Sequence, residues 1–267
     1  MEQKDFIFMQ NNEEFLFIKK EEKYYYCGPS NRSLVAVEAA FLGGLLTGDA
    51  SFTKTSLGIQ LTDIKIVAYV AAKFETNITI YKSKKKQSYK PVYRTFLTRK
   101  SRLCEILCWI YLFLGDRQTK LANRLLLKID PHGDWENAFP TQLIAREHNE
   151  PVLLNRFCTD MEFAWLAGYF VTEGHIYIDK RPPIPYPSIV FETTEKDVIE
   201  YTSILLCKSY FIVKRPTTAG NILYKTKLNR RTRLRYIFEG ILPHLKPFPD
   251  VQKEVQGALD LLDRLEK

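Results

Sequence analysis

The sequence predicts an α+β protein built from two halves, each with the element order helix, strand, strand, helix, strand, strand, helix. Apolar residues recur at helical and strand spacing in this order on both sides of a proline-containing segment that lacks periodicity. Such a repeat indicates two halves related by a pseudo-two-fold axis, because a solenoid needs three or more short units. We therefore divide the chain into an N-terminal extension at 1–33, a first half at 34–129, a linker at 130–158 and a second half at 159–267.

The first half follows an extension that contains three short β-prone runs, which begin at Phe6, Phe15 and Tyr24. Ser33 is expected to cap the first helix, and Asp63 to begin the second. The predicted elements of this half are a helix over 34–48, strands near 50–54 and 56–62, a helix over 64–74, strands over 76–83 and 90–98, and helices near 101–114 and 117–129.

The second half repeats this order. A proline-rich turn after Arg181 separates its first two strands. The predicted elements are a helix over 160–172, strands near 174–180 and 187–193, a helix over 195–208, strands over 210–215 and 221–229, and helices over 230–242 and 250–266.

The composition indicates a folded protein with a surplus of basic residues. Hydrophobic residues make up 45% of the 267, which is typical of globular chains. Lys and Arg number 39 against 31 Asp and Glu, so the net charge is +8. This excess favours a polyanionic partner, although a solvated basic face would give the same number.

The five cysteines and four histidines exclude some kinds of site. The cysteine count is odd and no Cys-x-x-Cys pair occurs, which argues against a zinc knuckle or a disulfide framework and favours a reducing compartment.

The most apolar run, 103–114, is too short to cross a bilayer, so we expect no membrane partner. Because the N-terminus has neither a signal nor a transit peptide, we expect an intracellular protein made where it works, in an organelle (mitochondrion or chloroplast) or in bacterial or phage cytoplasm.

The opening helices of the two halves are similar in sequence. The first contains FLGGLLTGDASF from Phe41, and the second contains WLAGYFVTEGHI from Trp165. Each ends in an acid, Asp49 or Glu173. Glycine costs about 1 kcal/mol relative to alanine inside a helix, and a close approach of two helices would justify that cost. We therefore expect the two helices to lie side by side with both acids at their C-terminal ends. The small residues in question are Gly43, Gly44, Ala167 and Gly168.

Two carboxylates at helix C-termini repel each other and the negative ends of the helix dipoles. Divalent cations remove this conflict, and hard oxygen ligands suit Mg²⁺, which keeps bound waters and accepts phosphate oxygens. Such ions can activate a water and stabilise the leaving oxygen of a phosphodiester. We expect about two or three Mg²⁺ or other divalent cations at Asp49 and Glu173, with Gly48 and Thr172 beside them.

These two segments resemble the LAGLIDADG family of homing endonucleases, in its double-motif, monomeric form. Leu42–Ala50 and Leu166–Gly174 each match the nine-residue signature, and with the element order the resemblance covers roughly 34–266. Two departures concern local turn geometry, because Ala50 replaces the usual final glycine and Thr172 replaces the glycine before the second acid. Both acids are retained.

The resemblance implies two curved antiparallel sheets that form a DNA-binding saddle and lie in successive major grooves. Alternation supports two-sided strands, for example over 57–62 and 221–229, although solvent-facing strands alternate in the same way. Basic residues gather on the hairpins of both halves, where phosphate contacts would supply affinity. The predicted DNA-binding residues are Lys54, Gln60, Thr62, Lys82, Lys84, Lys85, Lys90, Arg94, Lys180, Lys214, Arg215, Lys225, Lys227, Arg230 and Arg231.

The resemblance also implies polar and basic side chains around the scissile phosphates. Gln60 and Glu192 occupy matching positions on the second strand of each half. Lys120 and Lys246 are the candidates for a basic residue beyond the third helix of each half. Asp63 and Glu195 match at the next helix start, where capping is the expected role.

The function that the resemblance implies is a site-specific endonuclease that makes a metal-dependent double-strand break in a long DNA target. A freestanding layout favours an intron-encoded enzyme, because no protein-splicing blocks flank the motifs. The alternative is an RNA-binding maturase or a recruited intron or ribosomal RNA-binding protein of the same fold, since a basic saddle can also bind structured RNA. Retention of Asp49 and Glu173 favours cleavage.

Overall fold

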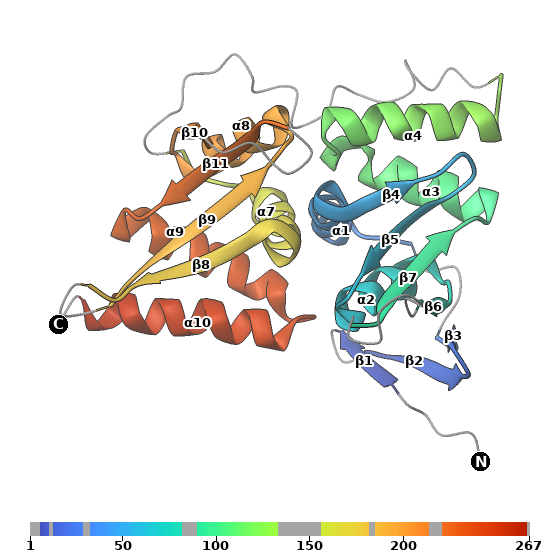
Figure 1. The fold of residues 1–267 in the computed structure, drawn as a ribbon, viewed down its shortest axis with the longest axis horizontal. Helices are drawn as coiled ribbons and strands as arrows, with labels where there is room; N and C mark the ends of the chain where they lie inside the picture. The colour runs from blue at the N-terminus through green and yellow to red at the C-terminus, as the bar shows by residue number, and fades with distance from the viewer. Residues whose placement is uncertain are drawn as a thin grey trace.

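The computed structural model describes residues 6–10, 13–28, 33–81, 90–132, 156–181, 185–213 and 221–265. These residues form two halves that lie side by side and meet at a central pair of helices (Figure 1). Most of the predicted linker, residues 133–155, lies outside the described residues. Among the described helices, none combines the length and the apolar character needed to cross a membrane.

The first half has the predicted order of elements. Its elements are α1 (Ala36–Asp49), β4 (Ala50–Phe52), β5 (Leu57–Leu61), α2 (Ile64–Phe74), β6 (Ile78–Tyr81), β7 (Val92–Leu97), α3 (Lys100–Ile110), the 3-10 turn η1 (Tyr111–Phe113) and α4 (Asp116–Ile129).

The second half repeats it. Its elements are α7 (Asp160–Glu173), β8 (Gly174–Asp179), β9 (Tyr186–Thr193), α8 (Lys196–Leu206), β10 (Tyr210–Val213), β11 (Leu223–Leu228), α9 (Arg231–Ile241), the 3-10 turn η2 (Leu242–Leu245) and α10 (Pro249–Arg264). The left-handed backbone conformation that ends α2 also ends α8. It occurs at Glu75 (φ 55°) and at Cys207 (φ 51°).

The two antiparallel sheets differ in size. The second half has four strands in the order β10-β11-β9-β8. The first half has the matching four, β6-β7-β5-β4, and the N-terminal extension adds β1 (Phe6–Gln10), β2 (Glu13–Lys20) and β3 (Lys23–Tyr26) beyond β6 to make seven. The three β-prone runs of the extension therefore form strands, and they widen only the first sheet.

Both central helices are buried on nearly every side. In α1 the nine consecutive residues from Ala39 to Thr47 are all buried. A helix that is apolar all round belongs inside a protein, because no face of it is suited to water. The motif helices are thus the shared centre of the two cores.

Helix starts follow local signals in some places and tertiary packing in others. Asp63 begins α2 as predicted, since its Oδ1 accepts from the amide of Lys65 at 2.8 Å. The prediction that Ser33 caps α1 is wrong. Leu34 is buried, and the helix begins after Val35, whose amide donates to Glu38 at 3.3 Å. Burial of the leucine delays the helix past the serine.

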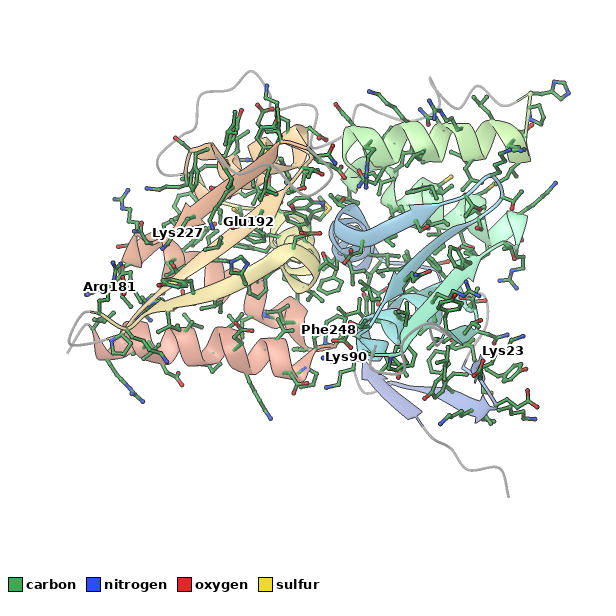
Figure 2. All side chains as sticks on the ribbon, in the orientation of Figure 1. Lys23, Lys90, Arg181, Glu192, Lys227 and Phe248 are labelled. Carbon is green, nitrogen blue, oxygen red and sulfur yellow. The ribbon has the colours of Figure 1, made fainter. Side chains whose placement is uncertain are left out.

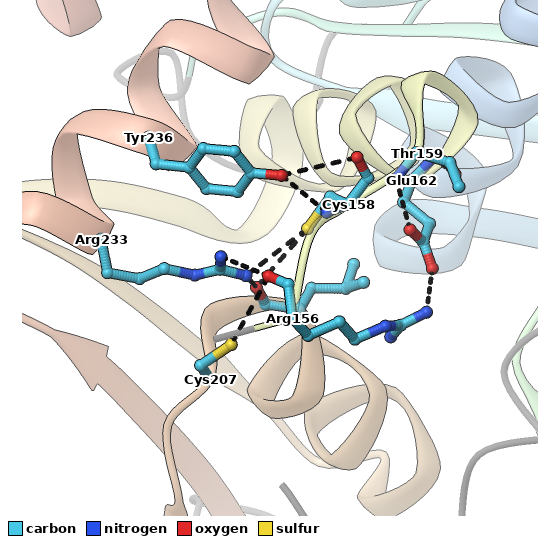
Figure 3. Close-up of polar contacts among 8 residues, drawn as sticks. Arg156, Cys158, Thr159, Glu162, Cys207, Arg233 and Tyr236 are labelled. Carbon is cyan, nitrogen blue, oxygen red and sulfur yellow. Dashed lines mark hydrogen bonds and ion pairs between the residues drawn. The ribbon is translucent and has the colours of Figure 1, made fainter. Parts of the chain in front are cut away.

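A partly buried arginine anchors the chain where it enters α7 (Figure 3). Arg233 of α9 donates to the carbonyls of Arg156 and Leu205, each at 2.5 Å. The hydroxyl of Tyr236 accepts from the amide of Cys158 at 2.7 Å. The bond to Leu205 satisfies a carbonyl that the end of α8 leaves without a helical partner. The end of the linker is thereby fixed to the second half.

Ion pairs between helix N-termini connect the halves along two opposite edges (Figure 1). Along one edge, Arg117 of α4 pairs with Glu195, the cap residue of α8, at 3.0 Å. Along the other, Lys65 of α2 pairs with Asp250 of α10. Arg117 and Asp250 are each the second residue of their helix, so the matching helices α4 and α10 present opposite charges to the other half.

Candidate active site

Glycines let α1 and α7 approach each other until their backbones touch. A Cβ atom on Gly44 would overlap the carbonyl oxygen of Trp165, and a Cβ on Gly168 would overlap that of Phe41. One turn further on, a Cβ on Gly48 would collide with the side chain of Thr172. The predicted close packing of the two motif helices is therefore present. Their C-terminal ends emerge together.

Not every small residue of the motif serves this contact. A Cβ on Gly43 would collide with the Cβ of Phe113, in the turn after α3. Gly43 therefore makes room for a ring of its own half rather than for α7. The carbonyl of Phe113 also accepts from Trp165 Nε1 at 2.9 Å, so this turn contacts both central helices.

The two acids lie close enough to affect each other's ionisation. Burial, then the charge of Asp49, then that of Glu195, raise the pKa of Glu173 to about 7. Burial also raises the pKa of Asp49. Among the described residues, no basic side chain forms an ion pair with either acid. Two partly buried carboxylates thus lie together without a compensating protein charge.

This arrangement fits a divalent cation bound jointly by protein, water and phosphate. The described residues contain no group of three or more His, Cys, Asp or Glu that could hold a metal by themselves. Two carboxylates are the number of acids that Mg²⁺ commonly takes from a protein when phosphate and water complete its shell. The last carbonyls of each helix, those of Gly48 and Thr172 among them, have no partner within the helix and could add neutral oxygens.

Glu195 lies beside this site, and its expected role as a cap is wrong. Its side chain makes no cap hydrogen bond. Its Oε1 instead accepts from Gln118 Nε2 at 3.1 Å and from Arg117 Nε at 3.0 Å. Burial raises the pKa of Glu195, while Arg117 and Gln118 oppose that shift. Its partners come from the other half of the chain, so the sequence around residue 195 gives no signal for them.

Gln118 ties this group to the first motif helix. The same Nε2 donates to the carbonyl of Thr47 at 2.8 Å, in the last turn of α1. Gln118 is fully buried, so this amide is a fixed link between α4, the end of α1 and Glu195. No sequence motif marks it, and it was not among the predicted site residues.

Gln60 and Glu192 lie where the sheets meet the motif helices. Ile59 pairs with Ala50, directly after Asp49, and Phe191 pairs with Gly174, directly after Glu173. Gln60 and Glu192 are the next residues on those strands, and they belong to the face opposite the buried Ile59 and Phe191. Each therefore lies on the exposed sheet face, near the helix end that carries an acid.

The structure separates the two predicted catalytic lysines. Lys120 is exposed in the first turns of α4, close in sequence to the buried Gln118. Lys246 instead lines a small cleft with Val37 and Phe41, at the opposite end of α1 from Asp49. Val37 and Asp49 are separated by roughly 18 Å along the helix axis, so Lys246 is not brought to the acids.

The repeat identifies a different match for Lys120. Lys120 is the fifth residue of α4, counted from Asp116, and Lys253 is the fifth residue of α10, counted from Pro249. Lys253 is exposed, as is Lys120. The offset between the halves is 124 residues at the motif acids (173 − 49) and 133 at the start of these helices (249 − 116), so a match counted on from the motifs falls near Lys246 and short of Lys253.

The predicted DNA-binding residues fall into four groups. The first group faces the exposed side of the two sheets and consists of Arg94 on β7 and of Lys225 and Lys227 on β11 (Lys227 is labelled in Figure 2). Arg231 does not face the exposed side of the sheet, because its Nη1 donates to the carbonyl of Leu265 at the end of α10. The exposed residues Lys54, Gln60, Thr62, Lys90, Lys180 and Arg230 are compatible with the prediction, and Lys82, Lys84, Lys85, Lys214 and Arg215 lie outside the described residues.

Aromatic and acidic neighbours hold these cations in place. Lys227 Nζ lies 4.8 Å from the ring centroid of Tyr177, and the Arg94 guanidinium lies 5.5 Å from that of Tyr81. Lys225 forms an ion pair with Glu192. The outer faces of both sheets therefore carry positioned cations, and the second sheet also carries an acid beside its motif helix.

Comparison with known proteins bears on the fold alone. No family model matches the sequence, and no curated protein matches it. Among solved structures, the LAGLIDADG meganuclease I-CpaMI bound to uncleaved DNA has a TM-score of 0.50 and 13% identity, covering 85% of this chain and 92% of that one. I-AabMI bound to uncleaved DNA has a TM-score of 0.48 and 14% identity, covering 85% of this chain and 91% of that one. The protein therefore has the LAGLIDADG homing endonuclease fold, with both motif helices on a single chain.

Proposed function

We propose that this protein is a site-specific homing endonuclease, intron-encoded, that makes a metal-dependent double-strand break in a long DNA target. The observation that carries the proposal is the pairing of Asp49 and Glu173 at the meeting point of the two halves, with no basic ion-pair partner among the described residues. A protein that only bound nucleic acid would gain nothing from two carboxylates placed where they repel a phosphate backbone.

The residues present suit hydrolysis of a phosphodiester in each strand. Asp49 and Glu173 would hold divalent cations, with the last carbonyls of α1 and α7 beside them. When bound, such cations polarise phosphate oxygens and lower the pKa of a coordinated water. Gln60, whose amide can both donate and accept, would orient a water in the first half, and Glu192 would accept a hydrogen bond from one in the second. The exposed Lys120 and Lys253 would stabilise negative charge on the phosphates.

The two sheets suit a duplex that crosses both halves. A β-ribbon fits the major groove, where all four base pairs can be distinguished. Arg94 and Lys225 occupy the exposed faces from which such contacts would come. The proposed partner is double-stranded DNA. I-CpaMI, which shares the fold, is described bound to uncleaved DNA.

Selection of cleaved sites from a randomised duplex library tests this function. The purified full chain is incubated with the library and Mg²⁺, and a parallel reaction contains EDTA. We expect recovery of a single long motif with Mg²⁺ and of none with EDTA. Absence of cleavage together with tight binding of structured intron RNA would overturn the proposal in favour of a maturase. A motif recovered equally with EDTA would overturn the metal dependence.

A further inference from the structure

A single row of outward side chains crosses the first sheet and continues onto the N-terminal extension. Gln60 of β5 pairs with Arg94 of β7, Arg94 pairs with Thr79 of β6, and Thr79 pairs with Lys23 of β3. Side chains of directly paired residues lie on the same face of a sheet. Lys23 therefore belongs to the face that carries Gln60 and Arg94, and Figure 2 shows it toward the outer end of the first half.

The strand that carries Lys23 is held firmly against the sheet. The amide of Tyr26 donates to Asn77 Oδ1 at 3.0 Å, and the amide of Ile80 donates to the carbonyl of Glu22 at 2.8 Å. On the opposite face, Tyr24 and Phe17 are buried in the first core. This packing fixes which face of β3 is outward, because a slip of one residue would expose Tyr24.

A hollow of about 370 Å³ lies on this outward face, with Lys23 of β3 on its border. Lys23, Thr79, Arg94 and Phe96 line it from the strands, and its other lining residues are Glu75, Thr76, Asn77 and Thr98. Glu75 adds little negative charge, since its carboxylate pairs with Arg99 at 3.0 Å and with Arg102 at 3.3 Å. The hollow thus combines two cations, hydroxyls and an amide, which are groups that bind phosphate.

The width of the row indicates which part of a duplex would meet Lys23. Three strand spacings separate β5 from β3, which is about 14 Å. The major groove is about 12 Å wide, so a row that begins inside it must end over the sugar-phosphate backbone. We propose that Lys23 binds a backbone phosphate at the edge of the first half-site, making β3 part of the DNA interface. This inference rests on the proposed function, because it takes duplex DNA as the partner.

The second half has no equivalent of this contact among its described residues. Its sheet ends at β10, and the position that matches Thr79 is Phe211, which pairs with Lys225 and is 51% exposed. The corresponding row is Glu192, Lys225 and Phe211, and it ends on an apolar ring rather than a cation. The extension would therefore make the protein hold one half-site more strongly than the other.

The salt dependence of DNA binding tests the role of Lys23. Lys23→Ala is compared with Lys19→Ala, a matched loss of charge in the same hairpin. Lys19 pairs with Tyr24 and its Nζ lies 5.9 Å from that ring, so it belongs to the other face. The probe is the duplex recovered by the cleavage selection, and a mixed-sequence duplex serves in parallel. We expect the slope of log K against log salt to fall by about 0.9 for Lys23→Ala only, the value for one lost phosphate contact.

Neutral methylphosphonates, placed one at a time along the duplex, then locate the contact. We expect one position in the first half-site to weaken wild-type binding and to have no effect on Lys23→Ala. If wild-type protein binds and cleaves but the two variants behave alike, the role of Lys23 is refuted and the proposed function stands. If wild-type protein binds neither duplex, the proposed function fails and this inference fails with it. Equal melting temperatures of all three proteins confirm that folding is unchanged.

Discussion

Gly44 of α1 lies directly against the carbonyl oxygen of Trp165 in α7, and the repeat places Gly168 against Phe41 in the same way. Backbone therefore meets backbone across the pseudo-two-fold axis. The obstructing atom belongs to a rigid helix, so no side-chain movement could make room for a larger residue. This contact is what brings Asp49 and Glu173 to one place.

Replacement of Gly44 by alanine should therefore destabilise the protein although alanine favours helices. We expect a loss of about 3 kcal/mol in the free energy of unfolding, at the upper end of overpacking costs, and the same for Gly168→Ala. Gly257→Ala in α10 is the matched control, because nothing lies within 4 Å of its added Cβ. That variant should be unchanged or gain up to about 1 kcal/mol. Urea unfolding measures all three, and equal losses would contradict the contact.

Removal of either acid should abolish cleavage and spare binding. Asp49→Asn and Glu173→Gln keep the shape of each side chain but lose the charge that would hold a cation. We expect the cleavage rate to fall by at least about 1000-fold in each variant. Affinity for the duplex should change less than about threefold, because phosphate contacts on the sheets supply it. Cutting at the wild-type rate by either variant would contradict the assigned roles.

The raised pKa of Glu173 predicts a pH-dependent stability. Its folded pKa is about 7 against an ordinary value of 4.5, so the folded state binds the proton more tightly than the unfolded state. Stability from this group is therefore present below pH 4.5 and is lost as the pH rises through 7. Without metal, Glu173→Gln should melt a few degrees above wild type at pH 8 and together with it at pH 4.

Divalent cations should reverse this difference. Mg²⁺ should raise the melting temperature of wild-type protein at pH 8 but not that of Glu173→Gln, because this variant lacks one of the two carboxylates. Glu254→Gln, at an exposed site on α10, controls for loss of one surface charge. Identical responses of the three proteins to Mg²⁺ would argue against a cation at the paired acids.

The repeat predicts which lysines assist cleavage. Lys120→Ala and Lys253→Ala should each slow single-turnover cleavage by roughly 100-fold. Lys246→Ala should cleave at the wild-type rate, because its side chain lies in a cleft at the far end of α1. Nicked intermediates from the first two variants would show which lysine serves which strand. A slow Lys246→Ala with a normal Lys253→Ala would reverse this assignment.

Local sequence signals were enough for most elements and for the placement of the two acids side by side. Asp63 marks a helix start because its side chain accepts a hydrogen bond from an amide in the next turn. Asp49 and Glu173 are recognisable because the motif that each of them ends occurs twice in the sequence. Ser33 failed as a cap because burial of Leu34 decided where the helix begins. Propensity identified β-prone runs in the extension but could not reveal that β3 would pair with β6.

The parts of the site that the sequence did not reveal depend on contacts between the halves. Gln118 and Glu195 are 77 residues apart and meet only because α4 lies against α8. Their residue types are ordinary, and neither belongs to a motif. Lys253 was missed for a different reason, since the offset between the halves grows from 124 residues at the motif acids (173 − 49) to 133 at the start of the last helix (249 − 116).

The opposite charges that α4 and α10 present at the two edges bear on how separated half-molecules would associate. A homodimer of the second half would place Asp250 against Glu195 and Asp197, three acids at one helix junction. A homodimer of the first would place Arg117 near Lys65 but also near Asp63, which takes the place of Glu195, so one attraction would remain. Only self-association of the second half is therefore opposed by like charges alone, whereas co-expressed fragments would restore both attractions. Separated halves should accordingly form the mixed pair in preference to a pair of second halves.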